Sequence, residues 1–279
     1  MGFVEIGRVA WLEGDATQRH LLGISDMWIE QGAAGPMLYT ISEAGQMLAS
    51  FSLTGSAPRL IDRAAMPAGP ALGVDTEVSL IEAGGKTLAC VTGVAGRPAW
   101  LTATGDEGQI KGYGGDPFAA LPDDAAQILV TDVGSQSYAY VLRPGSDSIS
   151  AYRMAADGSY SAVYTPAPER PTSSGPGLSD LATLELHGKT WLAGASTDLD
   201  ALVLFRVAGN GVPVETDRVW NLTGIGLDTP SAVVTAVVGG HGYAVMASSN
   251  TSSITVAEIL ADGTLKVTDH VLDSLNTRF

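Results

Sequence analysis

Carboxylate side chains that could bind a hard cation or sugar hydroxyls recur in loops along this sequence. Asp147, Asp198 and Asp200 each stand between two apolar runs, and residues 197–200 form the densest acidic group. Ca²⁺ takes about six to eight oxygen ligands, so carboxylates that converge on one rim could hold it. We expect all three to bind ligand, with Asp198 and Asp200 as the metal ligands if Ca²⁺ is the cofactor. The simpler interpretation is that these aspartates only cap their own turns.

A cation and an imidazole stand side by side near the amino terminus. Arg19 could pair with an anionic ligand, and His20 could act as a base or a metal ligand. Both belong to a loop, residues 16–23, that we expect on the same rim as the aspartates, so they join the ligand-binding candidates. The sequence contains no Ser-centred elbow, His-Glu-x-x-His motif or phosphate-binding loop. We therefore assign no catalytic residue.

The overall charge limits the partners. The 279 residues carry 15 Lys and Arg against 30 Asp and Glu, a formal net charge of −15. Such a polyanion repels phosphate backbones and acidic headgroups, so we expect no nucleic acid and no membrane insertion. The single cysteine, Cys90, excludes an intrachain disulfide framework. With 45% hydrophobic and 16% charged residues, the chain has enough apolar material for a folded core.

Two sequence markers repeat in step along the chain. A short turn followed by a β-rich run ends at positions 38, 88, 138, 191 and 243. An Asp-Gly or Asn-Gly turn recurs at 157–158, 210–211 and 262–263, with weaker members at 107–108 and 56–57. Both markers recur about every 50 residues, a period that indicates a repeat fold.

Each repeat can be divided into four strands. In the fourth repeat, residues 181–186 and 212–220 alternate apolar and polar positions, while 191–195 and 201–207 are apolar runs. Four strands per repeat predict an all-β fold, a β-propeller of four-stranded antiparallel blades. The rival, a stacked β-solenoid, usually has shorter repeats. We expect one domain, residues 1–279, with blades at approximately 24–66, 78–118, 125–165, 178–221 and 230–274.

Residues 3–11 are left over as an orphan outer strand. The Val-Glu-x-x-Arg-Val pattern at 4–9 repeats residues 214–219, the last strand of the fourth repeat. Five repeats are visible, so two arrangements are open. The chain is either part of a longer ring of about seven blades, which we favour, or a five-bladed ring with an extra edge strand. An open ring would leave blade edges that a partner chain could cover.

The blade motifs resemble a known group of propellers. The pattern Asp-x-Ile-Ser-x-Tyr-Arg-Met-x-x-Asp-Gly at 147–158, matched by Leu-Phe-Arg-Val at 204–207 before an Asn-Gly turn, is similar to blades of lactonase-like seven-bladed propellers. It also resembles propeller segments that precede repeats-in-toxin calcium-binding nonapeptides in large secreted bacterial proteins. The resemblance implies an extracellular or cell-surface location in a bacterium, with the calcium array and export signal beyond Phe279.

Three functions are compatible with these patterns. The leading hypothesis is a non-enzymatic adhesion or binding module of a secreted or surface protein, with a protein or carbohydrate ligand on the acidic rim. The first alternative is a lactonase-like hydrolase whose site contains Arg19, His20, Asp198 and Asp200. The second is a structural subunit completed by a partner chain at its open ends.

Overall fold

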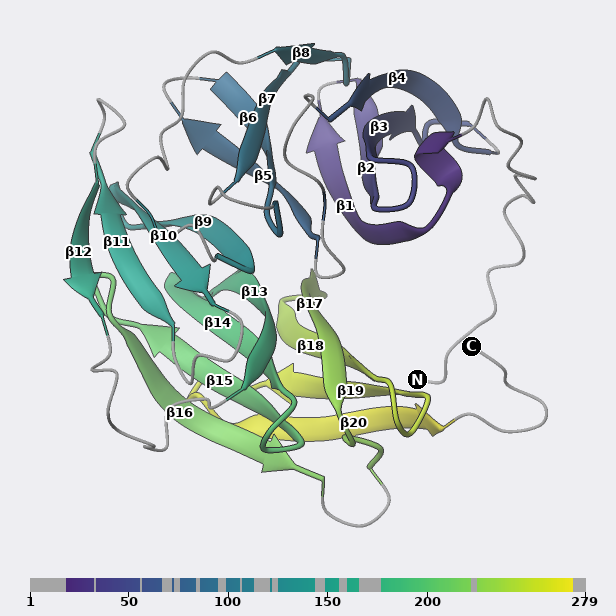
Figure 1. Ribbon diagram of the computed structural model, residues 1–279. Coiled ribbons are helices and arrows are strands. Elements are labelled where there is room, and N and C mark those ends of the chain that lie inside the picture. The colour runs from purple at the N-terminus through teal and green to yellow at the C-terminus, as the bar shows by residue number, and fades with distance from the viewer. Residues whose placement is uncertain are drawn as a thin grey trace. The chain divides into compact units, whose positions relative to one another are not determined.

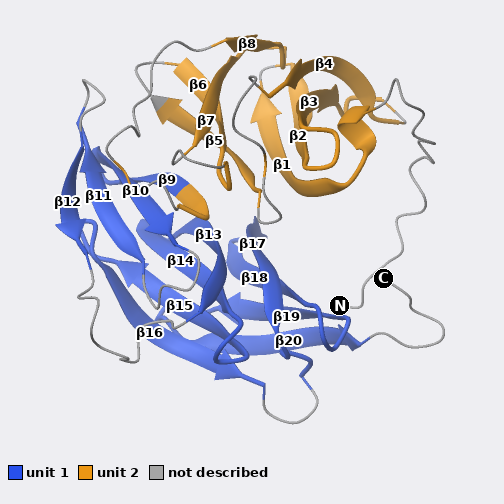
Figure 2. Ribbon diagram, in the orientation of Figure 1, with its two compact units in different colours: residues 1–2, 129–155, 160–279 blue, residues 3–128, 156–159 orange. Residues whose placement is uncertain are grey.

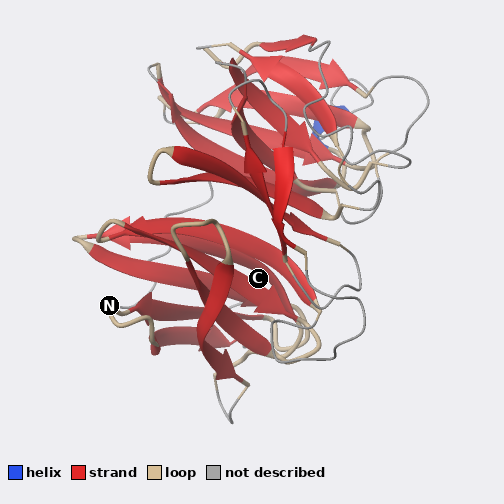
Figure 3. Ribbon diagram, turned by 90° about the vertical axis from the view of Figure 1, so that its left-hand side faces the viewer, coloured by secondary structure: helices blue, strands red, loops and turns tan. Residues whose placement is uncertain are grey.

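Strands make up nearly all of the described part of the chain (Figure 1). The computed structural model describes residues 19–32, 34–55, 57–66, 72, 76–83, 86–94, 99–105, 107–112, 121, 125–143, 149–155, 160–165, 177–221 and 225–272. Within these residues there is one helical segment, the 3₁₀ helix η1 (Arg19–Leu21), drawn in blue in Figure 3. No helix in the described part is long and apolar enough to cross a membrane.

The strands form five four-stranded antiparallel sheets, and in each sheet the strands are hydrogen-bonded in chain order. Blade 1 contains β1 (Ile24–Gly32), β2 (Gly35–Ser42), β3 (Met47–Ser52) and β4 (Arg59–Ala65). Blade 2 contains β5 (Val78–Ala83), β6 (Lys86–Val91), β7 (Trp100–Thr104) and β8 (Ile110–Gly112). Blade 3 contains β9 (Gln127–Val133), β10 (Gln136–Leu142), β11 (Ser150–Met154) and β12 (Tyr160–Tyr164). Blade 4 contains β13 (Leu178–Leu186), β14 (Lys189–Ser196), β15 (Ala201–Val207) and β16 (Pro213–Trp220), and blade 5 contains β17 (Pro230–Val238), β18 (His241–Ser248), β19 (Ser253–Ile259) and β20 (Leu265–Leu272).

This arrangement confirms the predicted fold class, an all-β fold of four-stranded antiparallel propeller blades. Short hairpin turns join neighbouring strands, as the Asp-Gly and Asn-Gly markers indicate. Residues 3–11 lie outside the described residues. The orphan strand and the number of blades in a full ring therefore stay predictions.

Contacts between Cα atoms divide the chain into two compact units (Figure 2). Unit 1 comprises Met1–Gly2, Leu129–Ala155 and Tyr160–Phe279, and unit 2 comprises Phe3–Ile128 and Ala156–Ser159. Blades 1 and 2 therefore belong to unit 2, while blades 4 and 5 and most of blade 3 belong to unit 1. Each unit is described by itself, and the expectation of a single domain stays a prediction.

The two sequence markers touch each other in unit 1. Gly211, at the turn before β16, lies against the ring of Tyr138 on the preceding blade, and its carbonyl accepts a hydrogen bond from the Tyr140 hydroxyl at 3.0 Å. Gly263, at the turn before β20, lies against Trp191, where an added Cβ would come within 3.1 Å of the indole. Both glycines have positive φ, 83° and 91°, so a side chain would be strained as well as crowded. The glycine turn of each of these two blades packs against the aromatic residue of the preceding blade. This contact explains why the two markers keep the same spacing along the chain.

Carboxylates on first strands hold neighbouring blades together. The Oδ2 atom of Asp26 on β1 accepts a hydrogen bond from the Val78 backbone N–H at 2.8 Å. In the same way, Asp180 Oδ2 accepts from Val233 N–H at 2.7 Å. Burial raises the pKa of Asp26 above its usual value, although the hydrogen bonds that it accepts from the backbone N–H groups of Val78 and Met27 oppose that shift. Asp180 lies inside β13, and its carboxylate reaches the first strand of the next blade.

Carboxylates on fourth strands also accept backbone hydrogen bonds from the next blade. Asp62 Oδ2 on β4 accepts from Ile110 N–H at 2.9 Å, and Asp217 Oδ2 on β16 accepts from Leu265 N–H at 2.7 Å. In both cases the donor is the first residue of the next blade's outer strand. A hydrogen bond to a charged acceptor stabilises by about 1.5–3 kcal/mol. We call these two bonds the outer clamps.

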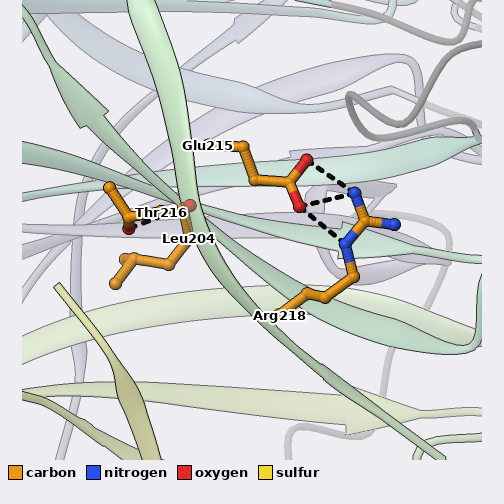
Figure 4. A network of polar contacts seen from close by, with 4 residues as sticks. All are labelled: Leu204, Glu215, Thr216 and Arg218. Carbon is orange, nitrogen blue, oxygen red and sulfur yellow. Dashed lines mark hydrogen bonds and ion pairs between the residues drawn. The ribbon is translucent and has the colours of Figure 1, made fainter.

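An ion pair fixes the surface of β16 (Figure 4). Arg218 donates from Nε and Nη2 to the two carboxylate oxygens of Glu215, each at 2.6 Å. Between them, the Thr216 hydroxyl donates to the Leu204 carbonyl at 3.3 Å. Glu215 and Arg218 are the charged residues that the orphan segment shares with β16, so the repeated pattern corresponds to a bidentate pair on an outer strand.

Candidate functional site

An open pocket of about 400 Å³ lies on blade 1, inside unit 2. It combines two guanidinium groups with an apolar wall, and its lining residues are Arg19, Gly45, Gln46, Met47, Arg63, Ala65 and Met66. The register explains this grouping, because Met47 pairs with Ala65 across β3 and β4, and Ala49 pairs with Arg63. Side chains two residues apart on a strand share one face, so Arg63 and Ala65 project to the same side.

The hydroxyl of Ser42 holds helix η1 against the β2–β3 turn and so positions Arg19. The Ser42 hydroxyl contacts the carbonyls of Arg19, at 3.1 Å, and Leu22, and it accepts a hydrogen bond from Gly45 N–H at 2.9 Å. A Cβ added at Gly45 would overlap the Arg19 carbonyl. The close approach of η1 to this turn therefore depends on glycine at position 45.

Gln46 holds the floor of the pocket. Its amide nitrogen donates to the Glu43 carbonyl at 2.6 Å, and its amide oxygen accepts from Leu72 N–H at 2.8 Å. The backbone carbonyl of Gln46 also accepts from Met66 N–H at 3.0 Å. Both chain segments that flank the pocket are thus tied to one residue, so the pocket is formed before any ligand binds.

His20 lies directly beside the pocket and is only 4% exposed. Its ring packs on Phe51, with centroids 6.1 Å apart, and its Nδ1 lies 3.4 Å from Nη1 of Arg63. Burial, followed by the Arg63 charge, lowers the pKa of His20 below its usual value. His20 is therefore neutral at pH 7, and its Nδ1 can accept a hydrogen bond from the Arg63 guanidinium.

The pocket offers a cationic site in a strongly acidic chain. The Arg19 side chain is exposed and makes no ion pair with the described residues. Guanidinium groups bind carboxylate, sulfate and phosphate oxygens in a bidentate manner. Arg19 and Arg63 could therefore hold an anionic group while Met47, Ala65 and Met66 contact an apolar part of the same ligand.

The predicted site residues fall in both units, and each unit is described by itself. Arg19 and His20 lie together in unit 2, whereas Asp198 and Asp200 lie in unit 1, in the turn between β14 and β15. Asp147 lies outside the described residues. The Asp198 carboxylate lies against Gly177, and Asp200 Oδ1 accepts from Thr229 N–H at 2.9 Å.

The described residues contain no cluster of side chains that would support the predicted Ca²⁺ site. Among them, no three His, Cys, Asp or Glu side chains lie close enough to hold a metal ion. Binding of Ca²⁺ by Asp198 and Asp200 stays a prediction.

Sequence reasoning missed Arg63. In the sequence it is one of several charged residues on a half-exposed outer strand, and nothing local separates it from Arg59. A signal was present in the alternation, because residues 63 and 65 share a face with position 47 across the predicted hairpin. Using that signal requires the β3–β4 register, which includes a bulge at Ser50 and Phe51.

Comparison with known proteins shows the fold. No family model matches the chain, and no curated protein is similar to it. A solved structure of a protein of unknown function from Desulfotomaculum acetoxidans is similar with a TM-score of 0.58 and 11% identity, covering 91% of this chain and 72% of that one. A proposed 6-phosphogluconolactonase from Bacteroides fragilis gives a TM-score of 0.55 and 19% identity, covering 85% and 67%. An exo-β-1,3-galactanase from Phanerochaete chrysosporium gives 0.54 and 10%, covering 91% and 67%.

These similarities support the lactonase-like propeller resemblance at the level of fold. At such low identity they do not extend to activity, since one propeller architecture hosts many functions. The association with repeats-in-toxin proteins stays a prediction.

Proposed function

We propose that this chain is a β-propeller binding module that takes a small anionic ligand in the pocket on blade 1. One observation carries the proposal: Arg19 and Arg63 line a single preformed pocket in a chain with a net charge of −15. Guanidinium groups are the side chains best suited to bidentate binding of carboxylate, sulfate or phosphate oxygens, and two of them line this one cavity. The non-enzymatic, extracellular adhesion role and a protein or carbohydrate partner on the acidic rim remain part of this proposal.

Calorimetric titration with sulfate and with gluconate, at constant ionic strength, tests the proposal. We expect saturable binding that Arg63→Gln and Arg19→Gln each weaken about tenfold or more, because a charge-assisted hydrogen bond is lost. Arg206→Gln removes the same charge from an exposed position on β15 and should leave binding unchanged. Absence of binding, or equal weakening by all three variants, would reject a specific anion site.

A lactonase-like hydrolase is the second candidate, favoured by the neutral imidazole of His20 beside Arg63. A neutral histidine can activate water, and a guanidinium can stabilise the oxyanion that forms on a carbonyl. Hydrolysis of δ-gluconolactone that is lost in His20→Gln but kept in Arg206→Gln would select this candidate. Anion binding without hydrolysis would select the binding module.

A further inference from the structure

The lining of the blade 1 pocket separates positive charge from apolar surface. Arg19 and Arg63 carry the charge, and an apolar wall is formed by Met47, Ala65 and Met66. Arg63 and Ala65 stand two positions apart on β4, about 6.6 Å along the strand. A ligand whose anionic group lies at Arg63 therefore reaches the apolar wall with a chain of a few carbon atoms.

Neighbouring strands and the core of unit 2 hold the apolar wall in place. Met47 pairs with Ala65 across β3 and β4. Met66 packs against a buried apolar cluster that includes Leu72, and its N–H donates to the Gln46 carbonyl at 3.0 Å. Methionine side chains are apolar and adapt to irregular shapes, so the wall suits a hydrocarbon chain.

The other polar groups of the lining are already engaged within the protein. Among the described residues that line the pocket, Gln46 is the only polar side chain besides the two arginines. Its amide nitrogen donates to the Glu43 carbonyl, and its amide oxygen accepts from Leu72 N–H. The Gly45 N–H donates to the Ser42 hydroxyl. A ligand rich in hydroxyl groups would lose hydrogen bonds to water against the apolar wall and gain no partner from it, which costs free energy.

We infer that the pocket selects an amphipathic anion, in which one acidic group is carried by a short unsubstituted hydrocarbon chain, over a sugar acid. The acidic group lies at Arg19 and Arg63, and the chain lies on the apolar wall. This inference rests on the proposed anion site and names the class of ligand that the site takes. The two arginines can bind the acidic group of either ligand, so the wall decides between them.

Calorimetric titration with hexanoate and gluconate, at constant ionic strength, tests the inference. The two ions have the same six-carbon chain and the same charge, but gluconate carries a hydroxyl on every carbon beyond the carboxylate. We expect hexanoate to bind about tenfold or more tightly than gluconate. From propanoate to hexanoate, affinity should rise about two- to fourfold with each methylene that leaves water. Hexanamide keeps the chain without the charge and should bind at least about tenfold more weakly than hexanoate.

Substitutions at Met47 test whether the apolar wall is the source of the preference. Met47→Gln places a polar amide of similar length on the wall and should reduce the preference for hexanoate to about twofold or less, with sulfate binding unchanged. Met47→Leu keeps the wall apolar and should keep the preference. Arg63→Gln should weaken the binding of hexanoate, gluconate and sulfate alike. The chain-length series uses the unchanged protein and does not depend on the folding of any variant.

The outcomes separate this inference from the proposed function. Sulfate binding with hexanoate no tighter than gluconate overturns the inference and leaves the anion site standing. An equal preference in Met47→Gln and in the unchanged chain also overturns it, because the wall would then not select the ligand. No binding of any of these anions rejects the anion site and the inference with it.

Discussion

Asp217 Oδ2 accepts a hydrogen bond from the backbone N–H of Leu265 at 2.7 Å, joining the outer strands of blades 4 and 5. The two residues are 48 positions apart, about one repeat. The turn before β20 closes through a hydrogen bond from Leu260 N–H to the Thr264 carbonyl, one residue before Leu265. Asp217 therefore supplies the acceptor for the Leu265 backbone N–H. The repeat therefore specifies contacts between blades as well as the blades themselves.

Loss of this clamp should destabilise unit 1. We expect Asp217→Ala to lower the free energy of unfolding by about 1–3 kcal/mol, because Leu265 N–H loses its partner. Asp217→Asn keeps a carbonyl oxygen as acceptor and should cost less. Urea unfolding of both variants measures the difference, and equal losses would mean that the hydrogen bond is not the source of the effect.

The glycines of the Asn-Gly and Gly-Gly turns allow a matched comparison. Gly211 and Gly240 both have φ near 83°, so alanine at either position is strained by about 1–2 kcal/mol. A Cβ on Gly211 would also collide with Tyr138, whereas nothing lies within 4 Å of one on Gly240. We expect Gly211→Ala to be the more destabilising by roughly 1–3 kcal/mol. Thermal unfolding of both variants gives the comparison, and equal effects would contradict the packing of the turn on Tyr138.

The pH dependence of stability should reflect the lowered pKa of His20. Its pKa is lowered on folding, so the unfolded chain binds its proton more tightly and stability rises with pH. The contribution is fully present above the unfolded pKa near 6.5 and is lost as the pH falls through the folded value. Between pH 7 and pH 5 the unchanged chain should lose more stability than His20→Gln, as measured by urea unfolding. His270→Gln, at an exposed position on β20, should keep the full pH dependence.

Thermal unfolding with and without calcium should show whether Asp198 and Asp200 bind a metal ion or only cap their own turns. If they bind Ca²⁺, the unfolding temperature rises in calcium relative to excess chelator, by an amount equivalent to about 2.7 kcal/mol at a hundred times the dissociation constant. Asp198→Ala should abolish the rise, and Glu185→Ala should retain it. No rise in the unchanged chain would leave both aspartates as turn residues.

The sequence by itself determined the blades. Residues 181–186 alternate apolar and polar positions with period two, residues 201–207 form an apolar run, and glycine turns recur about every 50 residues, so these strands were predictable from local patterns. It also singled out Arg19 and His20, because an adjacent cation and imidazole are distinctive side chains wherever they lie.

Only the tertiary structure decided what these residues meet. Arg63 joins Arg19 because a bulged register turns it toward the pocket, and Asp180 bonds to Val233 because its strand lies against the next blade. Local alternation fixes which residues share a face of one strand. The partners of that face stand about one repeat away in sequence, and packing of one sheet on another selects them.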